Sequence, residues 1–292
     1  FNSRCEVSLQ YRYLKNYITQ DNNVYEPFNI FAVLRPTLYE FYAKTFDVNL
    51  NEIDINLSDF PSLVDFFVRP LKYDARPIDQ NTSLVVSPAD GKVLYCGPIT
   101  SCSVQQVKGV TYNLRHFLED DDAYIKSLLT NPMNQLYQLT VYLAPGDYHR
   151  FHSSTHWEIK FRRHFQGKLL SVNPKIAKYL PDLFSLNERV IYIGKWADGF
   201  MAYSAVGATN VGSIKVYCDK DLYTNAIKWP EIKHWKDAKL NCIYLKKGEL
   251  FGEFRMGSTI ILLFEASKDF KFCVHVGQTI KMGQALSEYI PE

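Results

Sequence analysis

Three features are scarce in this sequence, and each scarcity argues against a class of protein. The six cysteines among the 292 residues show no CxxC or similar spacing, which argues against a thiolate zinc site and a dense disulfide framework. The formal net charge is only +2, so no nucleic acid partner is expected. No stretch reaches the roughly 18–20 apolar residues of a membrane-spanning helix. With 47% hydrophobic residues, the chain can still bury a sizeable core.

The N-terminal portion is predicted to be helical over residues 8–50. Its segment from Phe28 to Phe46 carries many apolar and aromatic side chains. We expect an amphipathic helix there that lies on a membrane surface or packs on the protein's own core, with Tyr42 and Phe46 on one face at i, i+4 spacing. Another helix start is expected within residues 56–67, followed by a proline-marked extended connector.

From about residue 82 the pattern changes to that of β-structure. Gln135–Leu143 is the clearest strand, and the apolar run Ile260–Phe264 is typical of a buried strand. We further predict strands over 84–86, 91–95 and 104–112, a helix over 117–129, a strand-loop-strand unit over 201–216 and a polar surface excursion over 219–240. We therefore predict an α+β fold that is mainly β.

The prediction divides the chain into a helical N-terminal portion, residues 1–75, and a β-rich domain, residues 76–292. The C-terminal tail repeats a Gly-Gln step at Gly277 and Gly283, which is similar to the tight hairpins of biotinyl and lipoyl carriers. We expect lipoyl-like sandwich or hybrid features from it. A carrier module is one alternative function, but Lys281 matches only part of the lysine pattern that such a module needs.

The tripeptide from Gly257 to Thr259 directly precedes the apolar strand. A glycine allows close approach to its carbonyl, and the hydroxyl of Ser258 can reach that carbonyl carbon. Attack would convert the amide between Gly257 and Ser258 into an ester. Taken alone, the tripeptide fits equally a glycine at a strand entrance followed by ordinary strand hydroxyls.

Four other residues are candidates for chemistry. Asp90 lies in a Pro-Ala-Asp-Gly turn, where aspartate commonly bonds the backbone two residues on. His149 and His152 share a loop after the strand at 135–143, with His156 beyond, and fit a structural pair, acid–base groups or metal ligands. A zinc hydrolase that uses these histidines or Asp90 as ligands is a second alternative function, and it predicts stoichiometric zinc.

Three motifs occur in order in this one β-rich chain: Ser-Pro-Ala-Asp-Gly, Tyr-His-Arg-Phe-His and Phe-Arg-Met-Gly-Ser-Thr. In this combination the sequence resembles the phosphatidylserine decarboxylase proenzymes, most closely their mitochondrial type. Residues 256–259 match the family's cleavage motif, residues 90–91 its Asp-Gly turn and residues 148–152 its Tyr-His-Arg-x-His loop. The resemblance extends over roughly residues 30–290.

The resemblance implies a self-processing precursor. Asp90, His152 and Ser258 would form the processing triad. Cleavage between Gly257 and Ser258 would release a β subunit, residues 1–257, and an α subunit, residues 258–292, whose Ser258 becomes a pyruvoyl group. His149 would serve the decarboxylation step.

The implied reaction converts phosphatidylserine into phosphatidylethanolamine and CO₂, with the pyruvoyl group as the covalent cofactor and no metal. The expected partners are phosphatidylserine, a membrane surface, the two subunits of one precursor and, in a homodimer, a second copy of the chain. Mitochondrial-type members carry a presequence and an inner-membrane anchor upstream. This sequence shows neither, so a mitochondrial inner-membrane location rests on the resemblance.

Overall fold

A computed structural model of the chain describes residues 30–80, 85–100, 103–107, 110–119, 128–208, 213–225, 235–255 and 257–288. Its helical segments are α2 (Ile30–Phe46), η1 (Leu50–Glu52), η2 (Leu57–Asp59), α3 (Leu63–Phe67), α4 (Leu114–Leu118), α6 (Pro174–Ala177) and α7 (Leu183–Leu186). Its strands are β1 (Gly91–Pro98), β2 (Ser103–Val107), β3 (Val110–Asn113), β4 (Asn134–Leu143), β5 (Arg150–His152), β6 (Trp157–Phe165), β7 (Arg189–Trp196), β8 (Gly199–Gly207), β9 (Ile214–Val216), β10 (Trp235–Leu245), β11 (Leu250–Phe254), β12 (Ser258–Ser267) and β13 (Thr279–Ile280).

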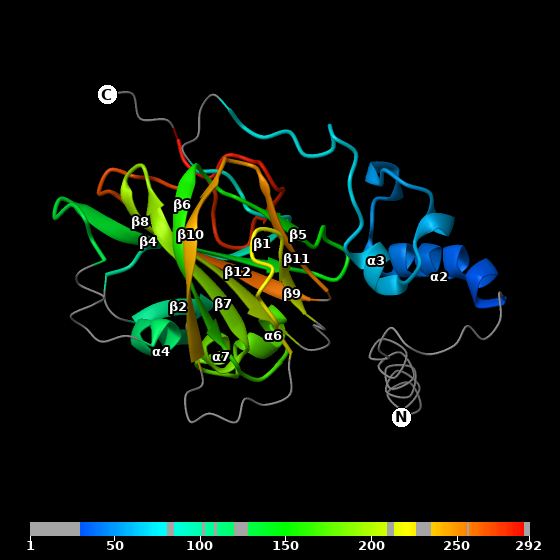
Figure 1. The fold of residues 1–292 in the computed structure, drawn as a ribbon, viewed down its shortest axis with the longest axis horizontal. Helices are drawn as coiled ribbons and strands as arrows, with labels where there is room; N and C mark the ends of the chain where they lie inside the picture. Colours follow the sequence, from blue (N-terminus) through cyan, green and yellow to red (C-terminus); the bar gives the residue numbers. More distant parts are fainter. Residues whose placement is uncertain are drawn as a thin grey trace.

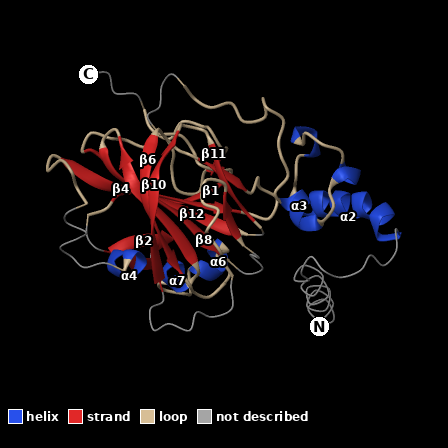
Figure 2. Ribbon diagram, viewed as in Figure 1, coloured by secondary structure: helices blue, strands red, loops and turns tan. Residues whose placement is uncertain are grey.

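The main feature of the fold is an eight-stranded antiparallel sheet in the order β10-β6-β7-β8-β12-β4-β1-β13. α2 and α3 lie together at one side of the strands, whereas α4, α6 and α7 gather at another place (Figure 1). Figure 2 shows the same view coloured by secondary structure, and most of the β-rich body is strand. The prediction of an α+β, mainly β fold is confirmed.

Both faces of the main sheet are buried, and this explains the unbroken apolar run in β12. Ile260 and Leu262 belong to the core on one face, whereas Ile261 and Leu263 belong to the core on the other. A strand covered on both faces needs apolar side chains in both directions, so it reads as a continuous hydrophobic run. The predicted buried strand over Ile260–Phe264 is confirmed.

A three-stranded sheet, in the order β5-β11-β9, covers the first of these faces. Phe151 of β5 and Phe251 of β11 pack into the same core as Ile260, and the ring centroids of Phe151 and Tyr203 of β8 lie 5.8 Å apart. The second face is covered by the β2-β3 hairpin with α4, α6 and α7. Because β11 leads directly into β12, the two sheets meet at the segment that carries the predicted cleavage site.

The N-terminal helical segments enclose a small core of their own. Its buried members are Tyr39, Ala43, Val48, Ile53, Phe60 and Phe66. The rings of Tyr39 and Phe66 stack with centroids 4.9 Å apart. Contacts among these residues hold α2 against η2 and α3. The division of the chain after residue 75 stays a prediction.

Two contacts hold the end of α2 against the loop that follows β4. The Tyr42 hydroxyl donates a hydrogen bond to the Pro145 carbonyl at 2.8 Å. A Cβ atom at Gly146 would lie 1.8 Å from the Phe46 carbonyl oxygen, so this approach of the two backbones requires glycine. The helical portion therefore rests directly on the loop that carries the candidate histidines.

The predicted helix of the N-terminal portion is confirmed from Ile30 onward, and residues 8–29 lie outside the described part. Tyr42 and Phe46 share one face as predicted, with ring centroids 4.5 Å apart. Of the two surroundings expected for this face, Tyr42 has the protein's own core, since it is half-buried and bonded to the loop after β4. Leu34, Leu38 and Phe41 are instead exposed, together with Phe46.

Three predictions within the β-rich region need correction. Of the polar excursion expected over 219–240, the part from Trp235 onward is β10, the edge strand of the main sheet, and residues 226–234 lie outside the described part. An edge strand can carry polar side chains because its free side faces water. The expected helix over 117–129 ends at Leu118, before the left-handed Glu119, and residues 120–127 are not among those described. Of the strand expected over 84–86, residue 84 lies outside the described part, and Val86 forms only an isolated bridge with Ala285.

None of the helices in the described ranges has both the length and the apolar character that crossing a membrane requires.

Candidate active site

Ser258 is the first residue of β12, and its side chain is fully buried. Alternation along β12 directs it to the same face as Ile260 and Leu262, under the small sheet, whereas Thr259 is directed to the opposite face. Among the described residues, the Ser258 hydroxyl has no hydrogen-bond partner. A buried polar group without a partner is costly, which suggests that this hydroxyl is kept for chemistry.

Gly257 precedes Ser258 with a φ of +57°. This is the left-handed region, which glycine enters without the steric cost that a side chain brings. The turn allows the chain to leave β11 and enter β12, a central strand of the main sheet. Met256 of the predicted cleavage motif lies outside the described residues.

The histidine loop is brought to the Ser258 end of the sheet by strand pairing. Leu143, the last residue of β4, lies opposite Ser258 in the register of β4 and β12. The Phe254 N–H donates to the His149 carbonyl at 2.9 Å, which ties the loop to the end of β11. Two segments more than 100 residues apart in sequence thus meet where the predicted cleavage site begins.

His149 is a buried, neutral histidine with one nitrogen unused. Its Nδ1 lies 2.9 Å from the Asp147 carbonyl oxygen, and its ring packs against that of Phe67, with centroids 3.9 Å apart and the ring planes tilted by 40°. Because a carbonyl oxygen only accepts, Nδ1 must carry the proton, and Nε2 is left as the basic atom. Nε2 has no partner among the described residues. Burial lowers the pKa of His149 to about 3, so the ring is uncharged near neutral pH.

His152 has the same tautomer but no free nitrogen. Its Nδ1 donates to the Gly248 carbonyl at 2.9 Å, and its Nε2 accepts from the Tyr148 hydroxyl at 3.1 Å. Burial lowers the pKa of His152 to about 4 and raises the pKa of Tyr148 to about 12. Any proton that His152 receives must therefore displace or pass through the Tyr148 hydroxyl.

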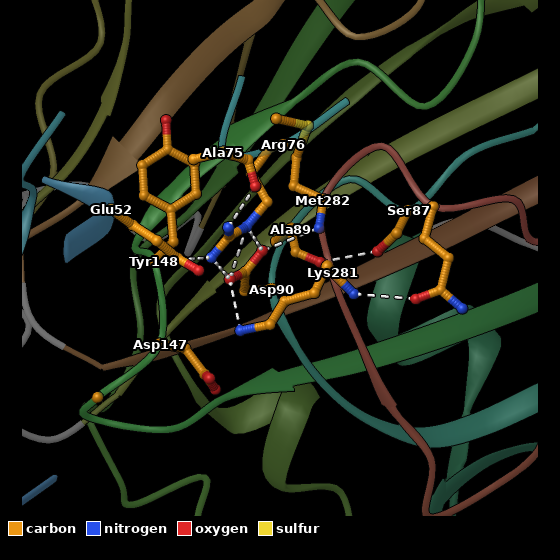
Figure 3. Close-up of polar contacts among 12 residues, drawn as sticks. Glu52, Ala75, Arg76, Ser87, Ala89, Asp90, Asp147, Tyr148, Lys281 and Met282 are labelled. Carbon is orange, nitrogen blue, oxygen red and sulfur yellow. Dashed lines mark hydrogen bonds and ion pairs between the residues drawn. The ribbon is translucent and has the colours of Figure 1, made fainter. Parts of the chain in front are cut away.

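Asp90 is a buried carboxylate held by two cationic side chains and a backbone amide. Arg76 donates from Nε and from its terminal nitrogen, at 2.9 Å to Oδ1 and 2.6 Å to Oδ2. Lys281 Nζ lies 3.1 Å from Oδ2, and the Met282 N–H donates to Oδ1 at 2.8 Å (Figure 3). Burial by itself would raise the pKa of Asp90, but these donors outweigh it and hold the pKa below its usual value.

The structure shows no hydrogen bond between the side chains of the three residues of the predicted processing triad, all of which are described. The His152 N–H donates to the Pro88 carbonyl at 2.8 Å, which places β5 beside the Asp90 turn. Within the described part, the Asp90 carboxylate is hydrogen-bonded to Arg76, Lys281 and Met282, and not to His152. The triad stays a prediction, and its assembly from this state requires His152 or Asp90 to exchange a partner.

Arg69 and Arg76 hold parts of the site in place, whereas from the sequence both were expected only to lie in an extended connector. Arg69 is buried, and its terminal nitrogen donates to the carbonyls of Gly146 and Asp147 at 2.7 and 3.1 Å, which fixes the loop before His149. Arg76 binds Asp90 as described above. Neither position carries a periodic or motif signal, because each partner lies in another part of the chain.

The zinc alternative has little support in the described residues, since no three His, Cys, Asp or Glu side chains there converge as metal ligands. The carrier alternative required a lysine displayed at a hairpin tip. Lys281 is instead engaged with Asp90. The groups available for chemistry are a buried hydroxyl directly after a left-handed glycine, two buried neutral imidazoles and an ionised carboxylate.

Comparison with known proteins is consistent with this chemistry. A family model described as phosphatidylserine decarboxylase matches residues 63–288. The mitochondrial phosphatidylserine decarboxylase proenzyme of Cricetulus griseus is 45% identical over 273 residues, which cover 87% of this chain and 66% of that protein. The corresponding Caenorhabditis elegans protein is 41% identical over 255 residues, with 87% and 66% covered. Proenzyme 1 of Saccharomyces cerevisiae is 34% identical over 339 residues, with 87% and 68% covered. The chain thus spans about two thirds of the length of these relatives.

Proposed function

The chain belongs to the phosphatidylserine decarboxylase family, and from that premise we propose that it is a self-processing, pyruvoyl-dependent enzyme that converts phosphatidylserine into phosphatidylethanolamine and CO₂. One observation of the structure supports this proposal independently of the family match. The hydroxyl of Ser258 is buried, has no hydrogen-bond partner among the described residues, and directly follows a left-handed glycine at the position where the family's cleavage motif falls.

The proposed self-cleavage uses only groups of this chain. The Ser258 hydroxyl adds to the carbonyl carbon of Gly257, the carbon–nitrogen bond breaks, and the hydroxyl proton reaches the departing nitrogen through a base. The resulting ester then loses the α-proton of residue 258 and expels the Gly257 carboxylate. Hydrolysis of the dehydroalanine that remains releases ammonia and leaves the pyruvoyl group at the start of residues 258–292.

The two neutral histidines are suited to separate roles in this scheme. His152, hydrogen-bonded to Tyr148, is the proposed base for processing, with Asp90 as its carboxylate partner. His149, whose Nε2 is unprotonated and has no hydrogen-bond partner in the described part of the chain, is proposed to hold and return a proton during decarboxylation. Burial lowers the pKa of both rings, so each is unprotonated at pH 7, and the same shift makes each a weaker base than a histidine in water.

The pyruvoyl group fits the place of Ser258, since its surroundings are apolar and the hydroxyl it replaces bonds to nothing in the described part. When present, it supplies a carbonyl that takes the substrate amine and draws off the electrons released with CO₂. β12, paired on both sides, would hold it rigidly at the strand's first residue. The buried surroundings would exclude water from the reacting carbon.

A lipid substrate requires contact with a bilayer, and we propose the exposed face of α2 for that contact. Leu34, Leu38 and Phe41 lie on one side of the helix at i, i+4 and i, i+7 spacing, and all three are exposed. Phe41 is 68% exposed, which is costly for an aromatic ring in water and favourable at a lipid interface.

The membrane proposal is tested with Leu38→Asp and Phe41→Asp combined, in flotation with phosphatidylserine-containing liposomes. Liposome binding should be lost while self-cleavage persists. Tyr179→Asp is the matched control, because Tyr179 is 83% exposed beside α6, away from α2. Binding by the double variant at the wild-type level would place the membrane face elsewhere.

We also propose a cellular location and an oligomeric state. The relatives' names describe mitochondrial proteins, and we propose a mitochondrial inner-membrane location for this chain. A homodimer is also proposed, and analytical ultracentrifugation of the purified protein would detect it.

The proposed function is tested by intact mass spectrometry of the purified protein beside Ser258→Ala. The wild type should give two species divided between Gly257 and Ser258, the smaller without a free amino terminus, and should release CO₂ from phosphatidylserine. The variant should stay whole and inactive. A wild-type chain that stays uncut for days would contradict the proposal, and bound zinc would then be measured.

A further inference from the structure

Asp90 is the meeting point of three separate parts of the chain. Arg76 reaches it from the connector after α3, while Lys281 and Met282 reach it from the C-terminal tail (Figure 3). Arg76 extends further, since the nitrogen that binds Asp90 also lies 2.8 Å from Glu52 Oε2 in η1. The carboxylate thus joins the helical portion, the β-rich domain and the segment that becomes the small subunit.

Arg76 makes the dominant contact in this cluster. Its side chain is 8% exposed and that of Asp90 is 1% exposed, so the pair is removed from water. The planar guanidinium presents Nε and a terminal nitrogen to both carboxylate oxygens, a two-point contact that fixes orientation as well as charge. Lys281 offers one bond from a half-exposed ammonium, which water can replace.

A buried carboxylate needs such a partner, because an unpaired charge in the interior is strongly unfavourable and the group would take up a proton instead. We propose that Arg76 is a positioning residue for self-cleavage, which keeps Asp90 ionised and oriented for its role beside His152. This inference rests on the proposed processing role of Asp90 and goes beyond it, since no motif of the chain pointed to Arg76.

Other charged and titratable groups face Asp90 from the elements around it and contribute to its electrostatic surroundings. Besides Arg76 and Lys281, they are Arg69, Asp147, Tyr148, His149 and His152. Among them only Arg76 and Lys281 hydrogen-bond the carboxylate. Loss of Arg76 therefore leaves Asp90 buried with one half-exposed cation and one backbone amide.

The experiment follows self-cleavage over time between pH 4 and 9 for the wild type, Arg76→Gln and Arg76→Lys. With Arg76→Gln we expect cleavage at pH 7 to slow by up to about 100-fold, the scale of loss when a reacting group is misplaced. The acid limb of the pH profile should move to higher pH, since the adjacent guanidinium lowers the pKa of the Asp90 carboxyl and the variant lacks it. Arg76→Lys should restore the acid limb but only part of the rate, because it keeps the charge and loses the two-point contact.

Arg162→Gln is the matched control. Arg162 is 10% exposed and binds the 2% exposed Asp219, so this variant removes a similar buried ion pair from the same large subunit. It should lower stability but leave the pH profile of cleavage unchanged. If Arg76→Gln does not fold, Arg76→Lys decides, because cleavage at the wild-type rate by that variant overturns the inference.

The outcomes separate this inference from the proposed function. An uncut wild type refutes the proposed function itself. A wild type that cleaves, together with Arg76 variants that cleave at the same rate and with the same acid limb, refutes only the role of Arg76. An equal shift of the pH profile in the Arg162 control would show a general loss of stability and would also overturn the inference.

Discussion

The buried neutral histidines predict a specific loss of stability at acid pH. His149 and His152 have pKa values of about 3 and about 4 in the folded precursor, against an ordinary value of about 6.5. Between those values the unfolded chain binds more protons than the folded one. Stability therefore falls as the pH drops below about 6.5, and the loss levels off once the pH passes below the folded values.

The size of the loss follows from the two pKa values. At pH 5, each histidine costs about 2 kcal/mol relative to pH 8, because the unfolded ring is mostly protonated and the folded ring is not. The two rings together account for about 4 kcal/mol. This is a large share of the 5–15 kcal/mol typical of a folded domain.

The assay is urea unfolding, followed by tryptophan fluorescence, in a Ser258→Ala background that keeps the precursor in one piece. Adding His149→Phe should reduce the loss between pH 8 and pH 5 by about 2 kcal/mol. The variant also removes one of the two hydrogen bonds that the Asp147 carbonyl accepts, the other coming from Arg69, but that cost is the same at both pH values and cancels in the difference.

The control is His156→Gln, since His156 is exposed and its replacement removes no buried ring. This variant should lose as much stability at pH 5 as its parent. If the His149→Phe variant also keeps the full acid loss, burial does not lower the pKa of His149 in the folded chain, and this prediction is refuted.

Three further predictions concern β12 and its flanks. Glu265→Ala should lower the free energy of unfolding of the Ser258→Ala precursor in urea by about 3 kcal/mol. The buried carboxylate accepts hydrogen bonds from the amides of Thr130, Asn131 and Phe200, which the variant leaves without it, and a loss below about 1 kcal/mol would contradict this. Gly257→Ala should slow self-cleavage, because a side chain at φ +57° costs about 1–2 kcal/mol, and a wild-type time course would refute the need for the left-handed turn. After cleavage, residues 258–292 should co-elute with residues 1–257 in size-exclusion chromatography until denaturant is added, because β12 pairs with β4 and β8 on its two sides; separation in buffer alone would count against this.

Several parts of the fold were predictable because they depend on local pattern. β4 and β12 follow from apolar runs of β-branched and aromatic residues, and α2 follows from its apolar helical segment. β10 was missed because its polar composition resembles that of a loop. An edge strand takes its structure from backbone pairing with β6 rather than from burial of its side chains, so composition alone gives little signal.

The candidate site was predictable only in its reactive members. Ser258, His149, His152 and Asp90 were identified because each lies in a short motif of residue types that suit the chemistry. The residues that hold them were not. Arg76 and Lys281 lie 14 and 191 residues from Asp90, and their contacts exist only because the connector and the tail fold back onto one turn.

The sequence by itself determined the β-rich class, the helical beginning and the set of groups able to carry out an acyl shift, because these depend on residue type and on spacing of a few positions. The tertiary structure decided which partner each of those groups has. It determined that Asp90 is bonded to Arg76 and not to His152, that Nε2 of His149 has no partner among the described residues, and that Tyr42 is hydrogen-bonded to the loop after β4. The reason is physical: pairing and burial set the charge, tautomer and exposure of a side chain, and both arise from segments that meet only when the chain has folded.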